Sequence, residues 1–268
     1  MNEAHNPILL DVHNLTVSYG GKPVLWEIDF EMPFGVLGGI IGPNGSGKST
    51  LLKTIMALIE PLSGHVNIFG KGLDEVRSKV SYVPQRESVD WDFPASVLDV
   101  VLMGRYMKKS SFMGAYSKTD VEIAKSALER VGMDTFQNRQ ISKLSGGQQQ
   151  RVFMARAIAQ DADFYLMDEP FAGVDAASER LIMDVLLSIR DSGKSLLIVH
   201  HDLHTARDYF DWVVMLNTRL VAAGPKDEIF TEKNLQEAYG GKLTVLSQLA
   251  HLVKDRDFPV REKPRTKK

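Results

Sequence analysis

The chain has 268 residues, of which 44% are hydrophobic and 25% are charged, and 32 Lys and Arg against 34 Asp and Glu leave a formal net charge of −2. This length suffices for one large domain or for one domain with a subdomain, and the near balance of charge gives no general case for nucleic-acid binding. The absence of Cys excludes disulfides and thiol catalysis, and neither an apolar run of 18 residues nor an N-terminal signal pattern indicates that the chain itself crosses a membrane or is exported.

The N-terminal segment alternates between apolar and polar residues from Ile8 to Met32, with a Gly20-Gly21 pair in its middle. This pattern predicts two antiparallel strands joined by a tight turn. Tyr19 stands just before the turn, where its ring could stack on the flat face of a base or pack on the core as an ordinary strand aromatic. The residues alone leave both roles open.

The stretch from Gly42 to Thr50 matches the pattern G-x-x-x-x-G-K-[ST] without a mismatch. An apolar run over Val36 to Ile41 predicts a buried strand in front of it, and apolar spacing over Leu51 to Ile59 predicts a helix behind it. Glycines let the backbone wrap a polyphosphate, Lys48 adds a mobile positive charge, and Ser49 offers a hydroxyl for Mg²⁺. The predicted phosphate-binding loop comprises Gly42, Pro43, Asn44, Gly45, Ser46, Gly47, Lys48, Ser49 and Thr50.

Short strands are also predicted over His65 to Gly70 and over Val80 to Gln85. Gln85 ends the second strand, where its amide could reach Mg²⁺ or an attacking water; a surface glutamine at a strand end is the ordinary alternative. From Arg86 to about Gln160 strand signals disappear and helical spacing takes over, as in Val97 to Met103. This segment is therefore predicted to be a helical subdomain.

Within that segment, Leu144 and a Ser-Gly-Gly-Gln run precede helical spacing over Arg151 to Ala159. Backbone N–H groups are unpaired at the start of a helix, so this run predicts a second phosphate site, although a bare pentapeptide could also be only a helix cap. The four polar and glycine positions concerned are Ser145, Gly146, Gly147 and Gln148.

Two further apolar runs end in polar residues. Phe164 to Met167 is followed by Asp168 and Glu169, and Ser195 to Val199 is followed by a His-His-Asp run. A buried strand can bring both acids beside the phosphate loop, where Asp168 would hold Mg²⁺ through water and Glu169 would polarise a water for attack on a γ-phosphate.

The histidines of the later run also allow a different reading. His200, His201 and His204 could form a metal cluster, but no carboxylate or thiol pattern completes such a site. Beyond them, Trp212 to Leu216 and Arg219 to Ala223 predict a hairpin around a two-residue turn.

Taken in this order, the motifs resemble the ATP-binding subunit of ABC transporters over roughly Ile8 to Tyr239. The resemblance implies an α/β fold, the P-loop NTPase fold of ABC ATPases, with an antiparallel β subdomain and a helical signature subdomain. It implies an ABC ATPase domain over 8–240, with the helical subdomain inserted at about 86–160, and a C-terminal extension with a basic tail over 241–268. The implied cofactors are ATP and Mg²⁺.

The resemblance also carries roles to individual residues of this sequence. Adenine would stack on Tyr19, His201 would be the switch histidine, and Asp175 would belong to the loop that follows the acidic pair. Nucleotide contacts are implied for Tyr19, the loop from Gly42 to Thr50, Ser145, Gly146, Gly147, Gln148 and Asp175; catalytic roles for Lys48, Gln85, Glu169 and His201; and Mg²⁺ ligation for Ser49, Gln85 and Asp168.

Partners follow from the same resemblance. Two copies of the chain would face head to tail, each ATP lying between the phosphate loop of one copy and the Ser145 signature of the other. A polytopic membrane permease would hold the subunit at the cytoplasmic face of the cell membrane, and an extracytoplasmic metal-binding receptor would act indirectly. No nucleic-acid partner is expected.

A narrower resemblance, to the manganese and zinc importer branch, lies in the runs Tyr82 to Arg86, Val89 to Pro94, Val100 to Tyr106 and Pro170 to Asp175. It implies ATP-driven uptake of Mn²⁺ or Zn²⁺. The alternatives are an importer of a metal chelate of the siderophore type and a soluble ABC ATPase that acts on DNA or ribosomes instead of transporting.

Two segments remain open at this level. Trp91 and Phe93 form an aromatic run that suits a docking groove for the permease, the alternative being that they pack the helical subdomain. Beyond Leu252, seven Lys and Arg stand against three acids, which favours a solvated tail over one attracted to anionic lipid.

Overall fold

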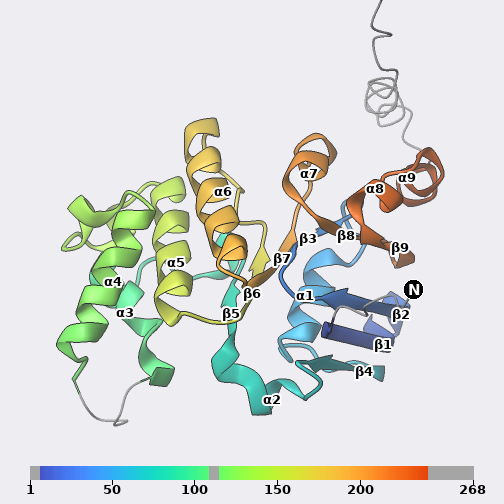
Figure 1. Cartoon of the computed structure of the whole chain (residues 1–268), viewed down its shortest axis with the longest axis horizontal. Helices are drawn as coiled ribbons and strands as arrows, with labels where there is room; N and C mark the ends of the chain where they lie inside the picture. Colours follow the sequence, from blue (N-terminus) through green and yellow to red (C-terminus); the bar gives the residue numbers. More distant parts are fainter. Residues whose placement is uncertain (1–6, 109–114, 241–268) are drawn as a thin grey trace, which may run out of the picture.

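The computed structural model describes residues 7–108 and 115–240 and consists of two sheets with flanking helices (Figure 1). The strands are β1 (Ile8–Tyr19), β2 (Lys22–Pro33), β3 (Leu37–Ile41), β4 (Ser63–Ile68), β5 (Val80–Val83), β6 (Phe164–Asp168), β7 (Ser195–Val199), β8 (Trp212–Asn217) and β9 (Arg219–Pro225). An antiparallel sheet has the order β2-β1-β4, and a six-stranded sheet has the order β5-β6-β7-β3-β8-β9. Only β9 runs antiparallel to its neighbour in the larger sheet.

The helices fall into groups that Figure 1 separates. Those of the middle segment lie at one end of the molecule and the antiparallel sheet at the other. The α-helices are α1 (Lys48–Ile55), α2 (Leu73–Val76), α3 (Val97–Met103), α4 (Lys118–Arg130), α5 (Gly146–Gln160), α6 (Ala176–Asp191), α7 (Leu203–Tyr209), α8 (Lys226–Ile229) and α9 (Glu232–Tyr239). Short 3₁₀ turns occur at Arg77–Lys79, Arg86–Ser88, Tyr106–Lys108, Asp134–Phe136 and Ile141–Lys143.

Both faces of the larger sheet are buried. Successive side chains of a strand point to opposite faces, and in this sheet they enter two different core clusters. In β7, Leu196 and Ile198 join the core cluster that contains α5 and α6. Leu197 and Val199 join the cluster that contains α1 and the antiparallel sheet. This burial explains why the central strands read as continuous apolar runs, and it leaves functional side chains to the strand ends.

Gly39, at the centre of β3, permits an aromatic side chain to pack closely against this strand. A Cβ at this position would lie 2.3 Å from Cδ2 of Phe210, whose ring is fully buried just after α7. A glycine here therefore lets the Phe210 ring pack directly on the strand backbone.

The α/β fold class predicted from the sequence is confirmed, and so are the predicted strands. The predicted helix behind the phosphate loop is wrong in length: α1 ends at Ile55, Ala57 adopts a left-handed φ of 53°, and Leu58 is 59% exposed. In the part of the chain that the structure describes, no helix is both long enough and apolar enough to span a membrane. The predicted C-terminal extension, 241–268, lies outside the described residues, and the domain bounds stay predictions.

Candidate functional site

The phosphate loop runs from the end of β3 into α1, and its glycines are required by both conformation and packing. Gly45 and Gly47 have φ values of 82° and 99°, which L side chains rarely adopt. A Cβ at Gly42 would lie 2.1 Å from the carbonyl oxygen of Leu216, and one at Gly47 would lie 2.5 Å from Cδ2 of Leu25. Any larger residue at Gly42 or Gly47 would displace this loop.

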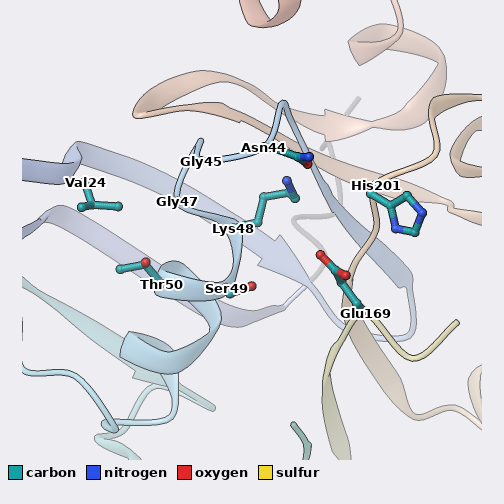
Figure 2. A pocket seen from close by; sticks show the side chains of 9 residues that line it. All are labelled: Val24, Asn44, Gly45, Gly47, Lys48, Ser49, Thr50, Glu169 and His201. Carbon is teal, nitrogen blue, oxygen red and sulfur yellow. The ribbon is translucent and has the colours of Figure 1, made fainter. Parts of the chain in front are cut away.

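A pocket of about 520 Å³ opens over the loop (Figure 2). Its wall comes from β2, from the loop and the first turn of α1, and from the residues that follow β6 and β7. The lining residues are Val24, Asn44, Gly45, Gly47, Lys48, Ser49, Thr50, Glu169 and His201. The structure thus brings together residues that are up to 177 positions apart in the sequence, Val24 and His201 being the extremes.

Lys48 is only 6% exposed, and its Nζ donates hydrogen bonds to the carbonyl oxygens of Gly42 at 3.0 Å and Pro43 at 3.1 Å. Burial lowers the pKa of Lys48, and the negative charges of Glu169 and Asp168 oppose that shift. The amine is therefore held inside the loop, with two carboxylates stabilising its positive charge.

Asp168 ends β6 and is fully buried. Its Oδ1 accepts a hydrogen bond from Oγ of Ser49 at 2.8 Å, while its Oδ2 has no hydrogen-bond partner among the described residues. Burial raises the pKa of Asp168, and the bond from Ser49 opposes that rise. An unpaired carboxylate oxygen beside a serine hydroxyl is a set of oxygen ligands that suits Mg²⁺.

Glu169 follows Asp168 directly but faces the pocket. Its φ of 49° lies in the left-handed region, which is uncommon for a residue with a side chain and recurs at functional sites. Figure 2 shows its carboxylate directed toward the side of the pocket that carries Lys48. This turn lets two adjacent acids occupy different environments, one buried and one accessible to a ligand.

The two histidines after β7 also separate. His201 is exposed and lines the pocket, whereas His200 is 3% exposed and its Nε2 lies 2.7 Å from Oγ1 of Thr205. The side chain of His204 lies outside the described residues, and among the residues that are described no group of three or more His, Cys, Asp or Glu is arranged to hold a metal ion. The metal-cluster alternative, which includes His204, therefore stays untested.

Several predicted site residues lie outside this pocket. Tyr19, at the end of β1, is 52% exposed, and Gln85 follows β5; neither lines it. Ser145 caps α5: its Oγ accepts from the Gln148 backbone N–H at 3.4 Å, and Oε1 of Gln148 accepts from the Ser145 N–H at 2.9 Å. The helix-cap alternative for this run is thus present in the structure, and its phosphate-binding role stays a prediction.

Asp175 lies close to the signature residues Ser145 to Gln148, because the residue before it, Val174, contacts Gly147. The Asp175 carboxylate caps α6 by accepting from the backbone N–H groups of Ala177 at 3.0 Å and Ser178 at 2.9 Å, and these hydrogen bonds lower its pKa. A Cβ on Gly147 would be 3.5 Å from Cγ1 of Val174. The segment after Glu169 therefore lies against the start of α5, and the nucleotide role of Asp175 also stays a prediction.

Arg86 is a residue to which the motifs assigned no role of its own. Its Nε and Nη2 donate to Oε1 of Gln149 on α5 at 3.3 and 3.1 Å, and a Cβ on Gly146 would lie 2.9 Å from its Cζ. The residue after Gln85 is thus bonded to the signature helix. Its position next to Gln85, at the end of the run Tyr82 to Arg86 that resembles the manganese and zinc branch, is the sequence signal that could have pointed to it.

A second, mostly apolar groove of about 250 Å³ lies on the helical segment. Trp91 is half-buried, its ring centroid lies 4.8 Å from that of Phe153, and its Nε1 donates to the carbonyl oxygen of Arg86 at 2.8 Å. Phe93 is 53% exposed at the groove. The sequence left open whether these two aromatic residues pack the helical segment or form a docking groove. In the structure Trp91 packs the helical segment, whereas Phe93 lies on the surface.

Comparison with known proteins agrees with this geometry. The family model described as ABC transporter matches residues 25–172. The chain is 58% identical over 240 residues to the manganese transport system ATP-binding protein MntB of Bacillus subtilis, covering 90% of this chain and 95% of that protein. It is 53% identical to the zinc transport system ATP-binding protein TroB of Treponema pallidum, covering 88% of each.

Solved structures show the same fold. An ATP-binding cassette, determined as a dimer in a post-hydrolysis state with ADP and Pi, superposes with a TM-score of 0.72 at 28% identity, covering 81% of this chain and 99% of that one. The resemblance drawn from the motifs is confirmed by these comparisons.

Proposed function

Because the chain belongs to the ABC transporter family of ATP-binding proteins, whose general activity is ATP hydrolysis, we propose that it is the ATPase subunit of an importer for Mn²⁺ or Zn²⁺. One observation carries the ATPase part of the proposal: Lys48, Glu169 and His201 meet in one pocket over a phosphate loop. The relatives at 58% and 53% identity, which are named for manganese and zinc transport, support the cargo.

ATP would bind with its phosphates in the loop. The N–H groups of the loop and the start of α1 suit a polyphosphate, and Lys48 would exchange its bonds to Gly42 and Pro43 for phosphate oxygens. The unpaired Oδ2 of Asp168 and the hydroxyl of Ser49 fit Mg²⁺, which would neutralise charge on the bound phosphates. Gln85 would join this set through its amide.

Hydrolysis would use the accessible acid of the pair. Glu169 would accept a proton as the oxygen of a water attacks the γ-phosphorus, and the bond from that phosphorus to the ADP oxygen would break, so that ADP and phosphate leave. His201, on the same wall, would hydrogen-bond the γ-phosphate and fix the direction of attack.

A single chain offers one part of the complete site in this proposal. Ser145 lies outside the Lys48 pocket, so the signature would serve the nucleotide of a second copy, and ATP would be held between the two copies. The dimeric cassette at 28% identity supports this arrangement. Tyr19 would contact the base, and Asp175 would lie near the junction of the two copies.

In the proposed transporter, the chain would lie at the cytoplasmic face of the membrane, bound to a polytopic permease. A metal-binding receptor would deliver the metal ion to this permease from outside the cell. Exposed Phe93 and the groove beside it would receive the permease. Because this subunit does not touch the cargo, its branch of the family supports the choice of metal indirectly.

Two measurements test the proposal. Phosphate release from Mg-ATP by the full chain, alone and co-purified with its permease, tests the ATPase, and absence of release from both would refute it. Uptake of radiolabelled Mn²⁺, Zn²⁺ and ferric chelates in a strain lacking the chain tests the cargo: we expect loss of high-affinity Mn²⁺ or Zn²⁺ uptake. A defect confined to chelates would favour a siderophore-type importer, and co-purification with nucleic acid would favour a soluble ABC ATPase.

A further inference from the structure

His200 is a buried polar residue that the proposed chemistry does not use. It lies between the pocket residue His201 and the end of β7, and its backbone N–H donates to the carbonyl oxygen of Ile40 in β3 at 3.0 Å. The backbone on one side of His201 is therefore fixed to the strand that leads into the phosphate loop.

Among the described residues, the His200 ring has one polar contact at hydrogen-bond distance. Its Nε2 lies 2.7 Å from Oγ1 of Thr205 on α7, and that hydroxyl in turn donates to the carbonyl oxygen of Asp202 at 3.5 Å. A hydroxyl can both donate and accept, so Thr205 can pair with Nε2 in either tautomer of the neutral imidazole. Burial lowers the pKa of His200 to about 4, and the ring is therefore neutral near pH 7.

Aromatic rings hold the rest of the imidazole. Phe171 meets it edge-on, with centroids 5.5 Å apart and an interplanar angle of 87°, and Phe210 does so at 5.6 Å and 74°. Phe171 is buried two residues after Glu169. The His200 ring thus contacts the segment that carries Glu169, and it lies 5.7 Å from the ring of His201.

We propose that His200 is a positioning residue, which sets His201 relative to Glu169 by joining the segments after β6 and β7 to α7. This inference rests on the proposed ATPase function and assigns a role in that same site. His200 does not line the pocket, so it acts on the reaction through His201 and the Glu169 segment and leaves the phosphate-binding contacts of Lys48 unaltered.

The test removes the polar contact from either side. His200→Leu and Thr205→Val in the full chain should each lower kcat for ATP about tenfold, the loss expected for one positioning hydrogen bond, with KM changed less than twofold. The double variant should lose no more than either single one, because both remove the same bond. Thr205→Val keeps the test valid if His200→Leu fails to fold.

Matched variants separate positioning from bulk structure. His200→Gln places a side-chain amide, which can donate or accept, where Nε2 lies and should recover most of kcat, whereas the shorter His200→Asn should not. In a His201→Ala background, His200→Leu should have no further effect. Rates are expressed per nucleotide-binding site, so that misfolded protein does not count.

The outcomes distinguish the two proposals. Wild-type kcat in His200→Leu and Thr205→Val, equal losses for the Gln and Asn variants, or an undiminished loss in the His201→Ala background would each overturn the positioning role while leaving the ATPase intact. Absence of ATP hydrolysis by the wild-type chain and its permease complex would overturn both.

Discussion

Glu169→Gln is the most direct test of the pocket. The substitution keeps the length and shape of the side chain and removes its basicity, and it leaves the left-handed backbone at this residue, the Ser49–Asp168 bond and the Lys48 contacts in place. A positioned general base contributes about 10²- to 10⁴-fold to a rate, which corresponds to about 3 to 5 kcal/mol of activation free energy. We therefore expect kcat to fall by at least about 100-fold.

Binding should respond in the opposite direction. Glu169 contributes a negative charge to the pocket beside the buried carboxyl group of Asp168, and its charge acts on Lys48. Removing that charge lowers the repulsion of the phosphates, so ATP affinity should stay the same or rise severalfold. Slow hydrolysis with intact binding should then hold two chains together as an ATP-dependent dimer.

The assay pairs single-turnover phosphate release with size-exclusion chromatography in Mg-ATP. Glu122→Gln on α4, an exposed position far along the chain from the pocket residues, is the matched control and should behave as wild type in both measurements. Phosphate release by Glu169→Gln within threefold of wild type would refute the general-base assignment. A severalfold loss of ATP affinity would refute the electrostatic argument.

Four further substitutions probe separate features. Ser145→Arg in the Glu169→Gln background should retain ATP binding but elute as a monomer, because a bulky cation would occupy the place of the partner's γ-phosphate; a dimer peak would contradict the composite site. Phe93→Ala should lower metal uptake with unchanged ATP binding, whereas Trp91→Ala should lower the melting temperature because its ring packs on a core phenylalanine. Gly39→Ala should destabilise the chain by about 1 to 3 kcal/mol, since its Cβ would lie 2.3 Å from a buried ring, and an unchanged thermal denaturation midpoint would refute that packing argument.

The fold could be predicted from the sequence where both local pattern and burial agree. β6 and β7 are short apolar runs with polar residues at their ends, and the structure buries both strands completely. The end of α1 could not be predicted in this way, because apolar spacing continues to Ile59 while Ala57 turns the chain out of the helix. Periodicity reports which side chains are apolar and does not report where the backbone changes direction.

The site could be predicted as a set of residues but not as a geometry. The motifs and the family resemblance pointed to Lys48, Asp168, Glu169 and His201, and three of these line one pocket, yet no sequence pattern indicates that Glu169 lies in the left-handed region. The division between adjacent histidines was also hidden, because burial of His200 depends on rings that are distant in the sequence, such as Phe171. Contacts of this kind arise from the packing of whole elements and have no local signature.

The same helix, α5, serves the signature and the apolar groove. Its first turn is capped by Ser145, Gln149 in the next turn bonds Arg86, and Phe153 one turn further packs on Trp91. Arg86 follows Gln85 directly, and its carbonyl oxygen accepts the hydrogen bond of the Trp91 indole. Arg86 therefore joins the end of β5 to α5 through its guanidinium and to Trp91 through its carbonyl oxygen, so the residue after Gln85 is fixed to the helix that carries the signature and to the aromatic ring beside the groove.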